Sequence, residues 1–164
     1  MTETQVYLGI GSNIDRESNI RNGLEELQSC YGKLTISPVY ECEAFGFSGD
    51  DFYNLVVGLK TDLGIDELAH DLREIEYQFG RSINETRYSS RTLDIDLLLF
   101  GDQINEKYNI PRSDITEFGF VLKPLCEIAP NVKHPISGQT MRQLWDKFDS
   151  SREVMRSVHE RFKL

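Results

Sequence analysis

Hydrophobic residues alternate with polar or small residues along four segments of the chain, a pattern that predicts β-strands. These segments are residues 5–12, 33–42, 52–59 and 92–100. In two longer segments, residues 16–31 and 65–79, apolar side chains recur every three or four positions and predict amphipathic helices that end at Gly32 and Gly80. The resulting order, β-α-β-β-α-β, predicts an α+β ferredoxin-like sandwich, an antiparallel sheet with both helices on one face.

The segment after residue 102 has a less regular pattern, which predicts helical additions at the C-terminal end of this sandwich. Residues 140–148 have helical spacing, whereas residues 120–129 mix apolar and turn-forming residues. We expect a single domain over residues 1–148. Residues 149–164 are expected to form a peripheral tail, helical or partly ordered, because the apolar residues are spaced as in a helix: Val154, Val158 and Phe162.

The two faces of the predicted sheet differ in chemistry because side chains alternate between faces along a strand. In the fourth strand, one face carries Leu93, Ile95, Leu97 and Leu99. The opposite face carries small or polar residues from three strands: Gly9, Gly11, Asn54, Asp94 and Asp96. We expect the apolar face to pack against the helices. The opposite face, with residues 43–51 and 81–91 above it, is the predicted functional surface.

The charge of the chain limits the partners that it can bind. The 164 residues carry a formal net charge of −9, without the basic excess that binding a nucleic-acid duplex requires. An anionic nucleotide would need a divalent cation and local arginines. No long apolar segment predicts a membrane span or a membrane partner. The three cysteines lack metal-binding spacing, so we expect free thiols in a cytoplasmic protein, a monomer rather than an oligomer.

Asp94 and Asp96 are the central candidates for chemistry. Successive residues on one face of a strand lie roughly 6.5–7 Å apart, so their carboxylates can converge. Two like charges at close range favour a bound cation. Mg²⁺ takes one or two protein carboxylates and completes its shell with water and phosphate oxygens. The pair therefore indicates a metal–nucleotide site, and the alternative is two solvated aspartates on the sheet surface.

The residues around this pair add the charges that phosphate chemistry needs. Arg81, Arg87 and Arg91 directly precede the fourth strand, and arginine beside Mg²⁺ stabilises a transferring phosphoryl group. Glu76 lies near the end of the second helix, where it faces either the site or solvent. Asn54 offers both a donor and an acceptor to a heterocycle. The alternative is that these are solvated loop, helix and strand-edge residues.

Five blocks of the sequence occur in one characteristic order: YLGIGSN (7–13), FYNLV (52–56), EYQFGR (76–81), RTLDIDLLLFG (91–101) and FVLKPLCEIAP (120–130). In this order they resemble the 6-hydroxymethyl-7,8-dihydropterin pyrophosphokinase family of folate biosynthesis. The resemblance extends over about residues 5–148. It implies a ferredoxin-like fold and an enzyme that moves the pyrophosphate of ATP to the pterin hydroxymethyl group, releases AMP and uses two Mg²⁺ ions.

The resemblance also implies roles for individual residues. Asp94 and Asp96 would hold both metal ions, and Arg81 and Arg91 would steady the phosphates and the transition state. The residues expected to bind ATP are Arg81, Arg91, Arg112 and Glu76. The residues expected around the pterin are Asn54, Phe52, Phe45, Phe120, Cys42, Ala44, Tyr88 and Glu76.

Several positions depart from the pattern of the family. Arg112 replaces an expected His, Phe118 an expected Arg that faces ATP, Tyr88 a Trp, and Ser89-Ser90 a Gly-Pro-like pair. Arg112 would replace part of the lost charge. These changes leave one alternative to the pyrophosphokinase, a paralogue that binds a pterin with weak turnover or an altered substrate. A separate alternative is an acidic ferredoxin-like small-molecule sensor that needs no metal.

Overall fold

An antiparallel sheet forms the centre of the molecule. The computed structural model describes residues 3–43, 50–80, 92–151 and 153–158. The strands follow one another in the order β5 (Asp94–Phe100), β1 (Thr4–Ser12), β4 (Phe52–Thr61), β3 (Tyr40–Cys42) and β6 (Met155–Ser157), and β2 (Thr35–Ile36) also pairs with β4. Every pairing is antiparallel. The predicted ferredoxin-like α+β fold is confirmed.

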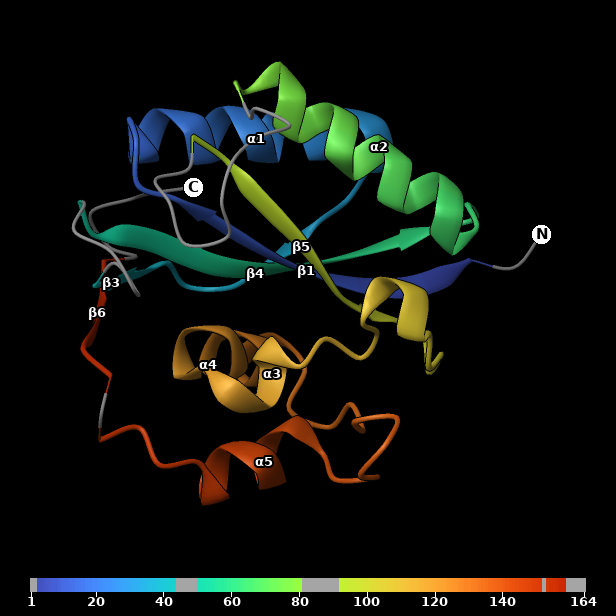
Figure 1. Ribbon diagram of the computed structural model, residues 1–164, viewed down its shortest axis with the longest axis vertical. Helices are drawn as coiled ribbons and strands as arrows, with labels where there is room; N and C mark the ends of the chain where they lie inside the picture. The colour runs from blue at the N-terminus through green and yellow to red at the C-terminus, as the bar shows by residue number, and fades with distance from the viewer. Residues whose placement is uncertain (1–2, 44–49, 81–91, 152, 159–164) are drawn as a thin grey trace.

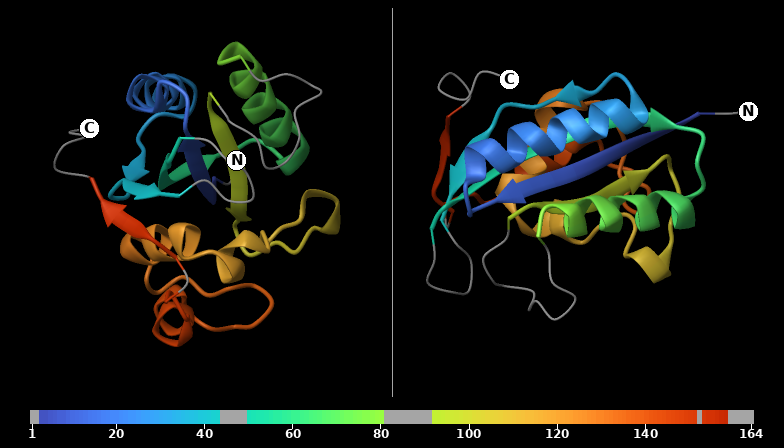
Figure 2. Two further views of the ribbon diagram at one scale, coloured as in Figure 1. Left: turned by 60° about the vertical axis from the view of Figure 1, so that its left-hand side comes forward. Right: turned by 90° about the horizontal axis from the view of Figure 1, so that it is seen from above.

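Two long helices, α1 (Arg16–Tyr31) and α2 (Ile65–Gln78), lie on one face of the sheet (Figure 1). Figure 2 shows from above that both helices lie over the sheet and run roughly along the direction of β1. Gly32 and Gly80 follow the two helices with φ angles of 81° and 94°, a left-handed conformation that favours glycine and ends a helix. The helices bury their apolar stripes against the sheet: Ile20, Leu24, Leu27, Leu68, Leu72 and Ile75.

Three further helices lie on the opposite side of the sheet, the last of them packed on the second, so this face is less open than the sequence pattern predicts (Figure 1). They are α3 (Asp114–Glu117), α4 (Gly119–Ile128) and α5 (Met141–Lys147), which follow a 3-10 turn, η1 (Glu106–Tyr108). The mixed segment 120–129 is thus mostly helix. A second buried cluster joins this layer to the sheet: Val56, Leu98, Leu99, Ile115, Val121, Leu122, Leu125, Ala129 and Met141. The predicted functional surface is therefore confined to one end of the sheet.

A β-bulge in β5 corrects the predicted orientation of Leu99. Tyr7 of β1 pairs with Leu99 and Leu8 pairs with Leu97, so Leu98 is an extra residue in the register. An extra residue reverses the alternation of side chains beyond it. Leu99 therefore packs in the second cluster, whereas Leu93, Ile95 and Leu97 face α1 and α2 as predicted.

Two further predictions about strands and the tail are corrected. Residues 33–42 form two short strands, β2 and β3, because Pro38 between them has no N–H to donate to the sheet. The tail is not helical where it is described, since Met155–Ser157 pair with β3 as strand β6 at the edge of the sheet (Figure 1). Val158 beyond it is buried in the first cluster, and its N–H donates to the Val39 carbonyl.

No helix among the described residues is both long and apolar enough to cross a membrane.

Candidate active site

A row of three residues across the sheet defines the floor of the site. Asp94 on β5 lies opposite Gly11 on β1, and Gly11 lies opposite Asn54 on β4. Neighbouring strands are about 4.8 Å apart, so roughly 10 Å separates the backbones of Asp94 and Asn54. The glycine between them carries no side chain. The row therefore presents a carboxylate and an amide at the two ends of a low floor.

Gly11 is required by the close approach of the Asn54 amide. A Cβ atom at Gly11 would lie 2.7 Å from Asn54 Oδ1 and 3.6 Å from Phe52 Cδ1. The first distance is shorter than any normal contact, so a larger residue would displace Asn54. The sequence thus keeps a small residue where a polar side chain must lie over the backbone.

Asp94 and Asp96 lie on the same face of β5, and both are partly exposed. Their carboxyl groups are hydrogen-bonded to each other. Burial raises the pKa of Asp94, an effect opposed by its hydrogen bond with Asp96. Burial and the charge of Asp94 raise the pKa of Asp96 well above its ordinary value. Without a bound cation, a state in which one of the two carboxyls is protonated is therefore favoured over a state in which both are ionised.

Glu76 is buried, with 2% of its surface exposed, so the alternative of a solvated helix residue is wrong. Its Oε2 accepts a 2.9 Å hydrogen bond from the backbone N–H of Ile95, the residue between the two aspartates. Strand β5 ends the described sheet, so an N–H on its outer side has no neighbouring strand to bind. Glu76 satisfies this N–H and fixes α2 to β5. Arg73 forms an ion pair with Glu76 at 3.6 Å.

Arg112 supplies positive charge beside the aspartate pair. Its Nη2 is 3.7 Å from Asp96 Oδ1, and its Nε is 3.1 Å from Asp114 Oδ2. Burial lowers the pKa of Arg112, and the carboxylates of Asp96 and Asp114 more than offset this effect, so its pKa is raised. The guanidinium therefore stays charged. Its predicted contact with ATP stays a prediction.

Besides Glu76, the described residues predicted to surround a pterin come from β3, β4 and α4. Cys42 on β3 lies opposite Phe52 on β4 and shares a face of the sheet with Asn54. Its thiol is buried, which raises the pKa to about 12, although a hydrogen bond with Asn54 opposes the rise. Phe120 at the start of α4 packs on the second cluster. The pocket that these residues would form, and their contact with a pterin, stay predictions.

Phe118 has a packing role at the position where the pattern of the family has an arginine that faces ATP. Its ring stacks on that of Phe120, with centroids 5.0 Å apart and planes 25° from parallel. The phenylalanine in place of the expected arginine therefore adds an aromatic ring that packs against Phe120, a residue predicted to lie beside the pterin.

Five of the predicted site residues lie outside the described part of the chain: Ala44, Phe45, Arg81, Tyr88 and Arg91. Their roles stay predictions. Among the described residues, no group of three or more His, Cys, Asp or Glu side chains is arranged to hold a metal ion. The metal assignment therefore rests on the two aspartates.

Two cavities border the elements that carry these residues. The smaller, with a volume of about 90 Å³, lies between α2 and β5, and its lining includes Glu76, Asp96 and Arg112. The larger, about 470 Å³, lies beside the start of α1 and is lined by Asn13, Asp15, Arg16, Asp50 and Asp51.

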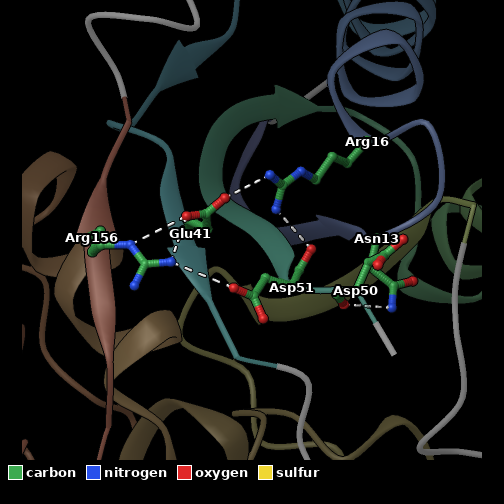
Figure 3. Close-up of polar contacts among 6 residues, drawn as sticks. All are labelled: Asn13, Arg16, Glu41, Asp50, Asp51 and Arg156. Carbon is green, nitrogen blue, oxygen red and sulfur yellow. Dashed lines mark hydrogen bonds and ion pairs between the residues drawn. The ribbon is translucent and has the colours of Figure 1, made fainter. Parts of the chain in front are cut away.

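A network of charges next to the larger cavity was not predicted from the sequence. It joins Arg16, Glu41, Asp51 and Arg156, from four segments distant in the chain (Figure 3). Strand β6 contributes Arg156 but has only three residues, too few for a periodic pattern to identify. Arg156 is one of several charged residues in this tail, so nothing else in the sequence identifies it as part of a network.

Comparison with known proteins adds independent information to this geometry. The family model for 7,8-dihydro-6-hydroxymethylpterin-pyrophosphokinase (HPPK) matches residues 7–130. A 2-amino-4-hydroxy-6-hydroxymethyldihydropteridine pyrophosphokinase from Aquifex aeolicus is 36% identical over 142 residues, which cover 84% of this chain and 88% of the relative. The protein of the same name from Synechocystis is 37% identical over 147 residues, covering 87% of this chain and 75% of the relative.

Solved structures show the same fold at lower identity. An HPPK-DHPS crystallised in complex with substrates has a TM-score of 0.69 and 13% identity over 88% of this chain. A Plasmodium falciparum HPPK-DHPS triple mutant has a TM-score of 0.67 and 16% identity over 89% of this chain. The aligned parts are 43% and 42% of those longer chains. Because the family model covers most of the chain and these two named relatives each match over more than four fifths of it, the chain belongs to the 7,8-dihydro-6-hydroxymethylpterin-pyrophosphokinase family.

Proposed function

We propose that this pyrophosphokinase transfers pyrophosphate from ATP to 6-hydroxymethyl-7,8-dihydropterin in a Mg²⁺-dependent reaction that yields the pterin diphosphate and AMP. Its family membership makes it a diphosphotransferase of folate biosynthesis. The observation that carries the finer proposal is the row Asp94–Gly11–Asn54. A flat heterocycle fits over the glycine, with its edge at the amide and its reacting group toward the aspartates.

The aspartate pair suits a hard divalent cation. The two carboxyls are close enough to hydrogen-bond, burial raises the pKa of both, and the charge of Asp94 adds to the rise at Asp96. Asp94 and Asp96 would hold two Mg²⁺ ions, which also take phosphate oxygens as ligands. Bound Mg²⁺ would neutralise charge on the phosphates during transfer.

The remaining residues act by binding and orientation. Asn54 would hold the pterin edge through its donor and acceptor atoms, and Phe52 and Phe120 would cover the ring and exclude water. Arg112 adds positive charge beside Asp96, to which Arg81 and Arg91 would add theirs. No general base is required, because in-line attack by the pterin hydroxyl depends mainly on position and charge stabilisation.

Replacing Asp96 by Ala separates the metal role from pterin binding. We expect kcat for pterin-dependent AMP release to fall by roughly 10²- to 10³-fold, because the charge of the transferring group loses its stabilisation. The Kd for pterin, measured by calorimetry without nucleotide, should change by less than about 3-fold. Asp102→Ala in the exposed turn after β5 is the matched control and should change neither value.

Two results would contradict the proposal. Equal losses of turnover and pterin affinity in Asp96→Ala would remove the metal role. Wild-type protein that released no AMP with MgATP and pterin, in an assay where a known enzyme is active, would exclude the reaction itself.

A further inference from the structure

The described part of the C-terminal segment contacts both sides of the predicted pterin pocket. Strand β6 pairs with β3 residue by residue, so that Met155 lies opposite Cys42 and Arg156 opposite Glu41. Two residues before β6, Glu153 reaches the start of α4, where Phe120 lies. One short segment therefore connects the strand with Cys42 to the helix with Phe120.

Arg156 binds the residues that directly precede Cys42 and Phe52. Its Nη2 is 2.6 Å from Glu41 Oε1 and 3.5 Å from Asp51 Oδ2, and its Nε is 3.2 Å from Glu41 Oε1 (Figure 3). Cys42 and Phe52 are partners in the β3–β4 register. The guanidinium therefore fastens together the two strand ends that carry these residues.

Arg16 at the start of α1 binds the same two residues from the other side. Its Nη2 is 2.6 Å from Glu41 Oε2, and its Nη1 donates to the Asp51 carbonyl at 2.9 Å (Figure 3). Its guanidinium also stacks on the Tyr53 ring, 3.8 Å from the centroid. The hydrogen bond from Arg156 lowers the pKa of Glu41, burial opposes this effect, and Arg16 adds to it. Glu41 thus stays charged between two arginines.

The network lies behind the pocket and outside it. Glu41 is opposite Tyr53 in the register, and Tyr53 packs on the α1 side of the sheet. Cys42 and Asn54 are each one residue further along and point to the other face. The arginines are therefore placed to fix the backbone without touching a ligand on that face.

Glu153 holds the other wall of the pocket. Its Oε2 accepts a 2.7 Å hydrogen bond from the Gly119 N–H, and its Oε1 accepts a 3.2 Å bond from the Phe120 N–H. The first N–H groups of a helix have no partners within it, and an acidic side chain satisfies them in place of a local cap. Phe118, the N-cap residue of α4, forms no such bond with its side chain, because a phenyl ring has no oxygen that could accept it. Glu153 therefore sets the position of the α4 start.

We propose that Glu153 and Arg156 are positioning residues for pterin binding, which place Phe120 against Cys42 and Phe52 through the C-terminal segment. The inference rests on the proposed function, because it takes the pterin as the ligand. Neither residue is proposed to contact substrate. Their contribution is to hold the two walls at one fixed separation.

Arg156→Met tests the inference through a split between kinetic constants. Misplacement of a binding wall lowers affinity for the group that it binds, so Kd and KM for the pterin should rise roughly 10-fold. The kcat and the KM for ATP should stay within about 2-fold, because no group on the phosphates changes. Arg156→Lys should restore part of the affinity, since lysine keeps the charge and loses the forked geometry.

The matched control is Arg21→Met, which removes another partly exposed arginine, paired with Glu17 on α1 at 3.1 Å. Both substitutions should lower Tm by less than about 2 °C, since such ion pairs contribute little to stability. Only Arg156→Met should change pterin binding. Glu153→Ala is the second variant and should also raise the pterin Kd, with partial recovery in Glu153→Gln, which keeps one acceptor.

The outcomes separate the inference from the proposed function. Wild-type protein that binds no pterin would overturn the proposed function and the inference with it. Wild-type binding with unchanged pterin Kd in both Arg156→Met and Glu153→Ala would overturn the inference alone. An equal rise in the pterin and ATP constants, or a similar effect in Arg21→Met, would show a general structural effect and would also overturn it.

Discussion

At the scale of single residues, the site depends as much on a missing side chain as on charged ones. Gly11 leaves the space in which the Asn54 amide lies, and a Cβ atom there would be 2.7 Å from Asn54 Oδ1. At Gly9, on the same strand and face, the nearest atom to a new Cβ is a flexible Leu98 methyl at 3.5 Å, an ordinary contact. A side chain is therefore excluded at Gly11 but could be accommodated at Gly9.

Gly11→Ala is therefore expected to weaken pterin binding, while Gly9→Ala serves as its control. The added methyl must displace the Asn54 amide, so the pterin Kd should rise at least about 10-fold, as expected for the loss of a buried polar contact. Gly9→Ala should keep pterin affinity within about 2-fold. Calorimetry without nucleotide measures both, and equal affinities in the two variants would contradict the role given to Gly11.

The aspartate pair should destabilise the metal-free protein at neutral pH. The pKa of Asp96 is raised by burial, so the folded protein binds its proton more tightly than the unfolded chain. The group contributes stability below the ordinary carboxyl pKa of about 3.9, and this contribution disappears as the pH rises through the raised value. Asp96→Asn removes the charge, and we expect a gain of about 1 kcal/mol at pH 7, or roughly 2–4 °C in Tm.

Thermal unfolding with EDTA and with added MgCl₂ measures this effect. The stability difference between variant and wild type should shrink as the pH falls toward 4. Mg²⁺ should raise the Tm of the wild type more than that of Asp96→Asn, because a ligand stabilises only the state that binds it. A metal-free variant less stable than the wild type at pH 7 would contradict the account.

At the scale of elements, the sequence predicts what periodicity can report and misses what depends on register. The long helices α1 and α2 and strands β1, β4 and β5 agree with the pattern, because each has enough residues to display its period. The bulge at Leu98 has no such signal, since one extra apolar residue in an apolar strand leaves the composition unchanged. The orientation of Leu99 could not be predicted for this reason.

The C-terminal elements were harder to predict because their structure is set by tertiary contacts. Helix α4 contains Pro124, and proline is disfavoured in the interior of a helix. The helix forms nevertheless, with its apolar side chains buried against the sheet. Strand β6 exists through its pairing with β3. In the site, the aspartates and Asn54 could be predicted from strand alternation. The roles of Arg16, Glu41, Glu153 and Arg156 depend on contacts between segments far apart in the chain.

At the scale of the whole molecule, one sheet supports two apolar clusters, one on each face. Leu97 belongs to one cluster and Leu98 to the other, so adjacent residues of β5 connect them. Loss of packing on either face should weaken the strand that both faces share. We therefore expect the helical layer formed by α3, α4 and α5 to unfold together with the rest of the domain.

Leu125→Ala tests this cooperativity. Leu125 on α4 is fully buried, so its truncation should lower the free energy of unfolding by about 2–5 kcal/mol. Trp145, the single tryptophan of the chain, packs on the second cluster and reports on this layer through its fluorescence. Its urea transition should coincide with that of far-UV circular dichroism in wild type and variant. An earlier fluorescence transition would show that the layer unfolds separately.

The bulge in β5 has a further consequence for how this strand can vary among sequences. Before Leu98, the residues on the site face are aspartates that serve chemistry, and after it the same face carries leucine that serves packing. The extra residue thus divides one strand into two halves with separate requirements. Substitutions that tune the reaction can accumulate in the first half while the second half drifts among apolar residues of similar size, and deletion of Leu98 would remove the bulge while leaving the aspartates and Leu99 on their present faces.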